Sequence, residues 1–212
     1  TYEKKSVDGV RLMVGFNRRF SPHAKEARNF FASRTNPLVM LYRVNAGRIP
    51  PDHWVQDPHV GGRCIVGEVC HFVDYMLALC GALPTSVFAG RVGRHSSGLT
   101  DDQCSVTLTF SDGSIGTIVY TAEGNAALPK ERFEAHADGR SLVMDDFMET
   151  SFYEGTRHRI FKTAKRDKGF SEEMASFVHA VETGGAPAIP FDQVEAVTRA
   201  CLLAVRSLQS GT

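Results

Sequence analysis

The sequence predicts an α+β fold with one large, open, mostly antiparallel β-sheet and helices packed on one of its faces. The first observation is a series of strand-like segments, joined by turn signals, between residues 86 and 163. The second is a set of amphipathic helical segments on either side of that series. Strands joined by tight turns pair antiparallel, and amphipathic helices bury their apolar stripe against a sheet.

Length and composition fit one domain and exclude several classes of partner. The chain has 212 residues, of which 24 are basic and 24 acidic, so its formal net charge is zero. A neutral chain has no overall attraction for nucleic acid or anionic lipid, and we expect neither partner. No apolar run approaches the roughly 20 residues of a membrane-spanning helix. Five scattered cysteines without a CxxC pair indicate reduced thiols in a cytoplasmic protein.

The N-terminal third alternates short apolar runs with helix signals. Residues 11–16 predict a strand, and Ser21 with Pro22 predicts the start of a helix that ends before Asn36-Pro37. Residues 38–44 predict a strand with apolar side chains on both faces. The loop that follows, residues 45–63, exceeds ordinary connections in length, and such loops often carry function.

The remaining elements follow from periodicity and turn residues. Residues 65–80 predict a buried helix that ends at Gly81. Strands are predicted over residues 86–92, 103–110, 114–122, 131–137, 141–145, 149–153 and 158–163. Asp-Gly pairs at 112–113 and 138–139 mark tight turns between strands.

Two amphipathic helices close the chain. Ser171 is the expected N-cap of a helix ending at Gly184, with an apolar stripe at positions 174, 177, 178 and 181. Asp192 with Glu195 predicts a capping box for the last helix. The few predicted helices can cover only one face of such a wide sheet. We therefore expect the other face to meet another domain or a second copy of the chain.

His71 is the sharpest candidate for chemistry. On a helix, Gly67, His71 and Asp74 share one face, and Glu68 lies beside them. A histidine among carboxylates can act as a general acid or base near neutral pH. The alternative is a buried histidine that Asp74 holds for structural reasons. A metal site is not predicted, since the adjacent Cys70 and His71 point about 100° apart on a helix.

Other polar residues are candidates for binding. Arg18 and Arg19 follow a predicted strand and precede a helix, where they could bind a carboxylate, a phosphate or sugar hydroxyls. His53 and Trp54 could stack on a sugar. Solvated arginines and a tryptophan that fills the core are the alternatives. No G-x-G-x-x-G or G-x-x-x-x-G-K-[ST] motif occurs, so the chain lacks a recognisable phosphate cradle.

Three segments resemble a known enzyme family: GFNRRFSPHA (residues 15–24), NAGRIPPDHW (45–54) and GGRCIVGEVCHFVDYMLALCG (61–81). They are similar to the C-terminal domain of the glucose–fructose oxidoreductase / inositol dehydrogenase / MocA family. More narrowly, they resemble its bi-domain branch, which is fused to a zinc-type alcohol dehydrogenase module. The resemblance implies that residues 1–14 are a linker and the last strand of a missing Rossmann domain. Residues 15–212 would then form a substrate-binding and oligomerisation domain.

The resemblance also implies an activity, namely NAD(P)-dependent hydride transfer to or from a sugar or polyol. NAD or NADP would be bound mainly by the absent domain, so the chain alone is expected to be inactive. The open sheet face would build a homo-oligomer. The alternative is a non-catalytic carbohydrate-binding or oligomerisation scaffold.

The family's Asp-x-x-x-His pair places its histidine at His71, but Gly67 stands where the aspartate is usual. Glu68 is therefore the expected substitute carboxylate, and Asp74 is expected to orient the imidazole. The resemblance places five residues on the substrate side: Arg18, Arg19, Arg48, His53 and Trp54.

Overall fold

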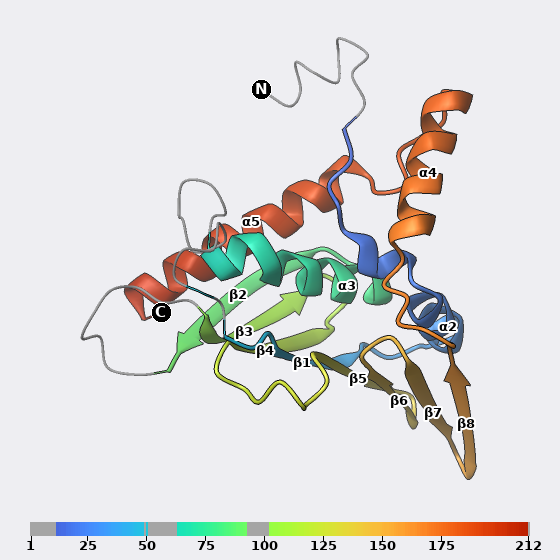
Figure 1. The fold of residues 1–212 in the computed structure, drawn as a ribbon, viewed down its shortest axis with the longest axis horizontal. Coiled ribbons are helices and arrows are strands. Elements are labelled where there is room, and N and C mark those ends of the chain that lie inside the picture. The colour runs from blue at the N-terminus through green and yellow to red at the C-terminus, as the bar shows by residue number, and fades with distance from the viewer. Residues whose placement is uncertain (1–11, 49, 51–62, 93–101, 212) are drawn as a thin grey trace.

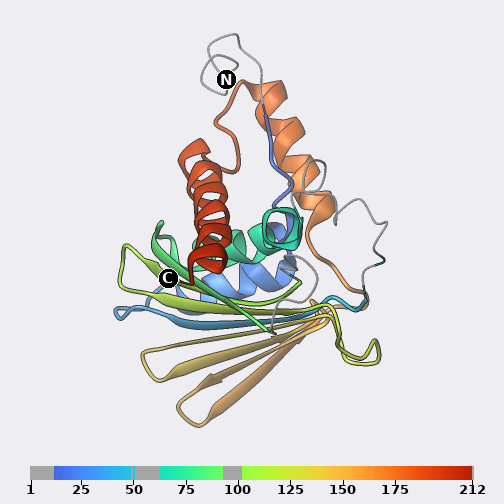
Figure 2. The same ribbon diagram turned by 90° about the vertical axis from the view of Figure 1, so that its left-hand side faces the viewer.

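The computed structural model describes residues 12–48, 50, 63–92 and 102–211. Within these residues the chain forms one eight-stranded sheet with the strand order β2-β3-β4-β1-β5-β6-β7-β8 (Figure 1). The helices lie on one side of this sheet (Figure 2). The predicted fold class is therefore confirmed: an open, mostly antiparallel sheet with helices on one face.

The elements follow the predicted order with small shifts at their ends. The helical elements are η1 (Asn17–Phe20, a 3-10 turn), α2 (Pro22–Phe31), η3 (Ile65–Val69, a π turn), α3 (Cys70–Cys80), α4 (Phe170–Thr183) and α5 (Phe191–Ser210). The strands are β1 (Val39–Asn45), β2 (Pro84–Arg91), β3 (Gln103–Phe110), β4 (Ile115–Thr121), β5 (Glu131–Ala137), β6 (Arg140–Asp145), β7 (Glu149–Glu154) and β8 (Arg157–Lys162).

Strand β1 lies inside the sheet and joins its two halves. Tyr42 of β1 pairs with Ile118 of the parallel strand β4 on one side and with Phe133 of the antiparallel strand β5 on the other. The other neighbouring strands of the described sheet pair antiparallel. On its outer face β1 leaves Val39 51% and Leu41 41% exposed, while Tyr42 is buried beneath the helices. The prediction of apolar side chains on both faces of this strand is confirmed.

The helix layer is made of α2, α3 and α5 over the sheet (Figure 2). The Ser21 hydroxyl accepts the Ala24 N–H at 3.0 Å and caps α2 as predicted. At the other end of the layer, Ser207 of α5 accepts the Ala89 N–H of the edge strand β2 at 2.9 Å. The predicted apolar face of α5 is confirmed, because its residues 197, 201, 204 and 208 are buried.

Helix α4 differs from the expectation. It projects away from the sheet (Figure 1), and it turns the side that bears Glu173 and Ala180 inward. Most of the predicted apolar stripe lies on its exposed side instead. The N-cap is Gly169 rather than Ser171. Gly169 has φ of 86°, and its backbone lies directly against η1, so the helix begins at this contact. Helix α5 likewise begins after Pro190, with no side-chain cap from Asp192.

Two further predictions are corrected near the N-terminus and around η3. Residues 12–16 do not form a strand, and the Phe16 N–H instead bonds the Val14 carbonyl at 2.7 Å in a tight local turn. The predicted helix over residues 65–80 begins as the π turn η3, with Gly67 at its centre, where a missing side chain weakens the preference for α geometry. In the part of the chain that is described, no helix is long and apolar enough to cross a bilayer.

Candidate functional site

His71 lies in the first turn of α3, at the junction with the π turn. Its half-buried ring meets the Phe16 ring edge-on, with centroids 5.9 Å apart. Burial and the positive charge of Arg18 lower the pKa of His71 to about 4. The imidazole is therefore neutral at pH 7. Its Nδ1 atom is buried without a hydrogen-bond partner among the described residues, which leaves one polar atom for a ligand to satisfy.

Asp74 does not orient His71, contrary to the sequence-based expectation. Its buried carboxylate accepts two hydrogen bonds from Arg19, from Nε at 2.9 Å and from Nη2 at 2.5 Å. Burial raises the pKa of Asp74 to about 6, although the Arg19 contacts favour its charged form. The carboxylate faces Arg19 because a guanidinium offers two donors in a fixed fork.

Arg19 also joins three helical elements of the layer. Beyond Asp74 of α3, its Nη1 donates to Gln193 of α5 at 2.8 Å. Its own carbonyl accepts a hydrogen bond from Arg28 of α2 at 2.7 Å. The side chain is buried, so in this structure Arg19 serves the packing of η1 on the helices.

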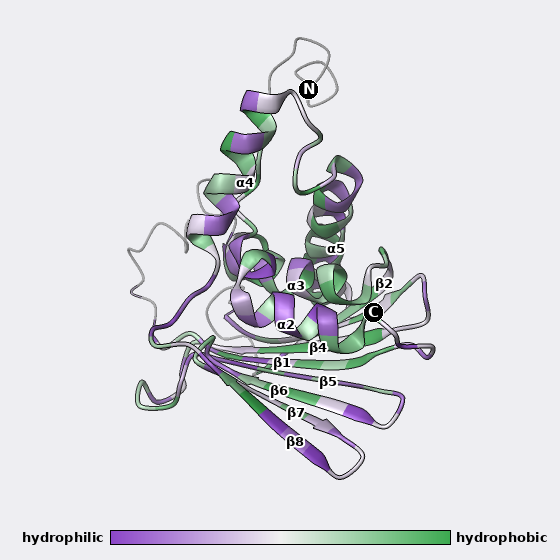
Figure 3. Ribbon diagram, turned by 90° about the vertical axis from the view of Figure 1, so that its right-hand side faces the viewer, coloured by the Kyte–Doolittle hydropathy of each residue, from purple (hydrophilic) through white to green (hydrophobic). Residues whose placement is uncertain are grey.

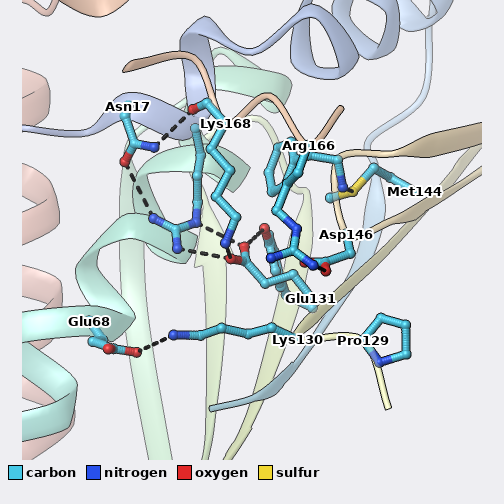
Figure 4. Close-up of polar contacts among 12 residues, drawn as sticks. Asn17, Glu68, Pro129, Lys130, Glu131, Met144, Asp146, Arg166 and Lys168 are labelled. Carbon is cyan, nitrogen blue, oxygen red and sulfur yellow. Dashed lines mark hydrogen bonds and ion pairs between the residues drawn. The ribbon is translucent and has the colours of Figure 1, made fainter. Parts of the chain in front are cut away.

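Glu68 lies in the π turn and is already engaged by two donors. Its Oε2 accepts the Tyr120 hydroxyl at 2.9 Å. The same oxygen accepts the Lys130 ammonium at 3.3 Å (Figure 4). Both Glu68 and Lys130 remain partly exposed. Their opposite charges also act on His71: Glu68 raises its pKa and Lys130 lowers it, which places the pair within electrostatic reach of the imidazole.

Arg18 faces the interior rather than an open surface. Its guanidinium forms a bidentate ion pair with Glu131, with Nε–Oε2 at 2.8 Å and Nη2–Oε1 at 2.9 Å. It also lies over the Phe72 ring at 4.9 Å from the centroid. Arg18 is 8% exposed and its guanidinium is paired inside the protein, so the structure does not present it on an open surface.

Glu131 is the centre of this network, and the sequence reasoning missed it. The buried carboxylate also accepts the Tyr42 hydroxyl at 2.7 Å and the Lys168 ammonium at 2.5 Å (Figure 4). Burial opposes its ionisation, but Arg18 and Lys168 outweigh burial and lower the pKa of Glu131 to about 2. A signal was present in the sequence: Glu131 is in phase with Phe133 and Ala135 on the buried face of β5.

The candidate residues therefore separate into groups. Glu68, His71 and Arg18 belong to one charged cluster with Lys130, Glu131 and Lys168. Asp74 and Arg19 form a second, buried pair. Arg48 is exposed, and His53 and Trp54 lie outside the described residues.

The sequence carries no glycine-rich phosphate motif, and the described residues hold no cluster of metal ligands. The glycine-rich turn that receives a pyrophosphate at a helix N-terminus has no counterpart in the sequence. Among the residues that the structure describes, no three histidine, cysteine or acidic side chains gather as metal ligands do.

The open sheet with its helix layer defines the class by fold: an α+β domain whose helices lie on one face of an eight-stranded, mostly antiparallel sheet. Residues 38–143, half of the chain, match the profile of the GFO/IDH/MocA C-terminal domain. The chain belongs to this family.

Solved structures share the fold over the whole chain. UDP-N-acetylglucosamine 3-dehydrogenase GnnA from Acidithiobacillus ferrooxidans superposes with a TM-score of 0.79 at 20% identity, covering 99% of this chain and 65% of that one. Aldose-aldose oxidoreductase from Caulobacter crescentus gives 0.79 at 18% identity, with 100% and 65% covered. At such identities the likeness shows the fold alone.

A curated relative is similarly longer than this chain. The uncharacterized oxidoreductase YrbE of Bacillus subtilis (strain 168) is 24% identical over 185 residues, which are 82% of this chain and 54% of the relative. The chain thus spans about half of this relative and 65% of each of the two structures.

Proposed function

We propose that this chain is the substrate-binding domain of an NAD(P)-dependent oxidoreductase that transfers hydride to or from a sugar or polyol. Family membership supports the reaction class, and two proteins of the same fold are a UDP-N-acetylglucosamine dehydrogenase and an aldose-aldose oxidoreductase. The observation that carries the proposal is His71, a neutral imidazole whose buried Nδ1 has no hydrogen-bond partner among the described residues. The charges that act on this imidazole are those of Arg18, Glu68, Lys130 and Glu131.

In this proposal His71 holds the reacting hydroxyl of the substrate by a hydrogen bond. Glu68 and Lys130 present an acceptor and a donor to neighbouring hydroxyls, since both remain partly exposed. Arg18 and Asp74 act as positioning residues, because their polar atoms are used inside the protein. Arg19 has the same role, and Arg48, His53 and Trp54 remain proposed contacts on the substrate side.

The cofactor is proposed to be NAD or NADP, held mainly by an N-terminal nucleotide-binding domain. That domain would hold the cofactor's phosphates, since this sequence has no glycine-rich phosphate motif. Residues 15–212 would form the substrate-binding and oligomerisation unit, inactive by itself. The narrower assignment, a branch fused to a zinc-type alcohol dehydrogenase module, rests on the three segments that resemble it.

The test replaces His71 in the complete polypeptide that the gene encodes. We expect His71→Ala to lower kcat by about 10²–10⁴-fold, the usual contribution of a proton-exchanging side chain. His136→Ala is the matched control, since His136 is exposed on β5. A wild-type polypeptide that reduces neither NAD nor NADP with any of a panel of sugars and polyols would contradict the proposal.

A non-catalytic scaffold is the second candidate, and the outer face of the sheet favours it. Val39 and Ile115 pair across β1 and β4 and are 51% and 44% exposed, and Leu41 and Val119 lie on the same face. Such a contiguous apolar patch is typical of an assembly surface. If His71→Ala reduced stability and left turnover unchanged, the scaffold role would be the better description.

A further inference from the structure

The charged cluster around His71 contains more cations than carboxylates. Its basic residues are Arg18, Lys130 and Lys168, and its acidic residues are Glu68 and Glu131 (Figure 4). Lys130 pairs with Glu68, whereas Arg18 and Lys168 share the single carboxylate of Glu131. One positive charge of the cluster therefore has no carboxylate of its own among the described residues.

The groups beside the cluster leave this balance unchanged. The Asp146 N–H bonds the Glu131 carbonyl at 2.7 Å, but the Asp146 carboxylate pairs with Arg166. Arg166 belongs to the hydrophilic connection between β8 and α4 (Figure 3). The hydroxyls of Tyr42 and Tyr120 add no negative charge, because burial raises the pKa of both tyrosines. The excess therefore remains positive.

The excess charge lies in a largely buried setting. Glu131 is fully buried, Arg18 is almost fully buried, and the Lys168 side chain is 16% exposed. Water stabilises a charge poorly at such depth, so a cation without its own counter-ion is costly there. An anion supplied by a ligand would offset this cost.

Lys130 is the cation of the cluster that a ligand can reach. Its side chain is 32% exposed, about twice as much as that of Lys168. The distance from its Nζ to Glu68 Oε2 is 3.3 Å, whereas tight hydrogen bonds between ions measure about 2.7–2.9 Å. An ammonium has three donors, and Glu68 takes one of them in the described structure. Lys130 is therefore loosely held and has donors to spare.

The backbone that carries Lys130 is fixed by strand β1. The Lys130 carbonyl accepts the Asn45 N–H at 2.7 Å. Arg43 donates from Nη1 to the Pro129 carbonyl at 2.6 Å, and Asn45 donates from Nδ2 to the Asn125 carbonyl at 2.7 Å. These bonds hold the segment before β5 in place, so Lys130 approaches its ligand from a rigid base.

Lys130 also lies close to the proposed reaction centre. Its partner Glu68 precedes His71 by three residues, and the helical turn η3 runs directly into α3. The Cβ atoms of side chains at this spacing are about 5–6 Å apart. A group bound to Lys130 can therefore belong to the same small molecule whose hydroxyl meets His71.

We propose that the substrate is an anionic sugar and that Lys130 selects it, by binding a carboxylate or phosphate group close to the hydroxyl held by His71. The proposal rests on the proposed function and deepens it, because it names the class of substrate. A neutral hydroxyl can also accept a hydrogen bond from Lys130, but it leaves the excess charge in place. Glu68 keeps the Tyr120 hydroxyl, and the positive excess offsets its repulsion of the anion.

The test measures kcat/KM of the complete product of the gene with matched anionic and neutral substrates. D-glucuronate and D-gluconate supply a carboxylate, D-glucose 6-phosphate supplies a phosphate, and D-glucose and sorbitol are neutral. D-galacturonate with D-galactose repeats the comparison on a second sugar. Lys130→Gln removes the charge and Lys130→Arg retains it. Lys25→Gln is the matched control, because Lys25 is exposed on α2. Unchanged melting temperatures verify that the three variants fold.

We expect the wild type to favour the anionic member of a pair by about tenfold or more. Lys130→Gln should lower kcat/KM for that substrate by about 10- to 100-fold, the range for a hydrogen bond to a charged group, mainly by raising KM. Its effect on the neutral member should stay within about twofold, and Lys130→Arg should keep most of the activity. The carboxylate and phosphate arms show which anion the site takes. A wild type that prefers the neutral sugars overturns the proposal, as do equal losses for both members of a pair in Lys130→Gln.

Isothermal titration calorimetry with the same sugars separates this proposal from the proposed function, since binding needs no turnover. If the anionic sugars bind, Lys130→Gln abolishes the binding and none is oxidised, the role of Lys130 stands and the function fails. If neutral sugars are oxidised while the anionic ones neither bind nor react, the function stands and the role of Lys130 fails. Absence of both binding and turnover across the panel overturns both.

Discussion

Arg18 and Glu131 form a buried bidentate ion pair that ties the turn η1 to the first residue of β5. The two residues are 113 positions apart in sequence, and the Arg18 guanidinium lies over the ring of Phe72 in α3, the helix that carries His71. Lys168 and Tyr42 complete the shell around the carboxylate. The cluster thereby links the start of the described chain, the sheet and the segment that leads into α4.

Glu131→Gln should destabilise the domain strongly. The change leaves Arg18 and Lys168 without their anion in a buried site, and breaking a buried ion pair costs about 3–5 kcal/mol. Urea unfolding at pH 7 measures the loss. Glu134→Gln on the same strand is the control, because its pair with Arg132 is partly exposed and should contribute about 1 kcal/mol or less. Similar losses in both variants would contradict the assignment of Glu131 as the centre of the network.

His71 should make stability fall as the solution becomes acidic. Its pKa is lowered from an ordinary 6.5 to about 4, so between these values the unfolded chain binds more protons than the folded chain. The contribution of His71 is present above pH 6.5 and is lost as pH falls toward 4.

The measurement compares urea unfolding of wild type and His71→Gln at pH 7 and pH 4.5. The variant should lose less stability over this interval. Burial also lowers the pKa of His23, so some dependence remains in the variant. The loss from Glu131 lies below pH 4.5, because its pKa is lowered from 4.5 to about 2. Identical pH dependence in the two proteins would show that the imidazole is not held neutral.

Gly169→Ala should separate α4 from η1. A Cβ at this position would lie 2.5 Å from the Asn17 carbonyl oxygen and 2.5 Å from the Ser21 nitrogen, and the residue has φ of 86°. Backbone atoms cannot yield as a flexible side chain does, so we expect a loss above about 2 kcal/mol.

Gly184→Ala at the opposite end of α4 is the matched control. Gly184 has φ of 69°, but nothing lies within 4 Å of its Cβ position, so the cost should be that of the left-handed backbone alone, about 1 kcal/mol. Thermal unfolding compares the two variants. Equal losses would mean that strain, and not contact with η1, sets the requirement for glycine at 169.

The double variant Leu41→Asp/Val119→Asp should break the homo-oligomer that we propose for the outer sheet face. Both side chains are 41% exposed, and two carboxylates in a desolvated interface oppose association. Light scattering after size exclusion gives the mass. Leu203→Asp, equally exposed on α5, should leave the mass unchanged. A wild-type chain that stays monomeric at all concentrations would rule out this interface.

The sequence predicted the sheet well because strand signals are local. Alternation over residues 103–110 and the Asp-Gly turns at 112–113 and 138–139 each lie within a few residues of the strands that they define. The prediction that α4 buries its apolar stripe against the sheet was wrong, because packing between distant elements is not a local signal. A stripe through Met174 and Val178 indicates that something covers it, but periodicity carries no information about which element does so.

The sequence nominates a candidate residue but does not assemble the site around it. His71 is the candidate because helix spacing and the resemblance both point to it. Its surroundings depend on contacts between distant residues: Asp74 bonds Arg19 and not His71, and Arg18 bonds Glu131. Glu131 was missed because a charged residue at a strand start resembles solvated surface until its partners are known.

The position of β1 has a consequence for how the chain folds during synthesis. This strand is made first among the eight, yet its partners β4 and β5 come much later in the chain. The later strands β5 to β8 can form consecutive hairpins as they emerge, because each strand pairs with the next one along the chain. Pairing between distant segments slows folding, and an unpaired apolar strand is prone to aggregate. In the nascent polypeptide β1 therefore stays without its sheet partners until β4 and β5 have left the ribosome.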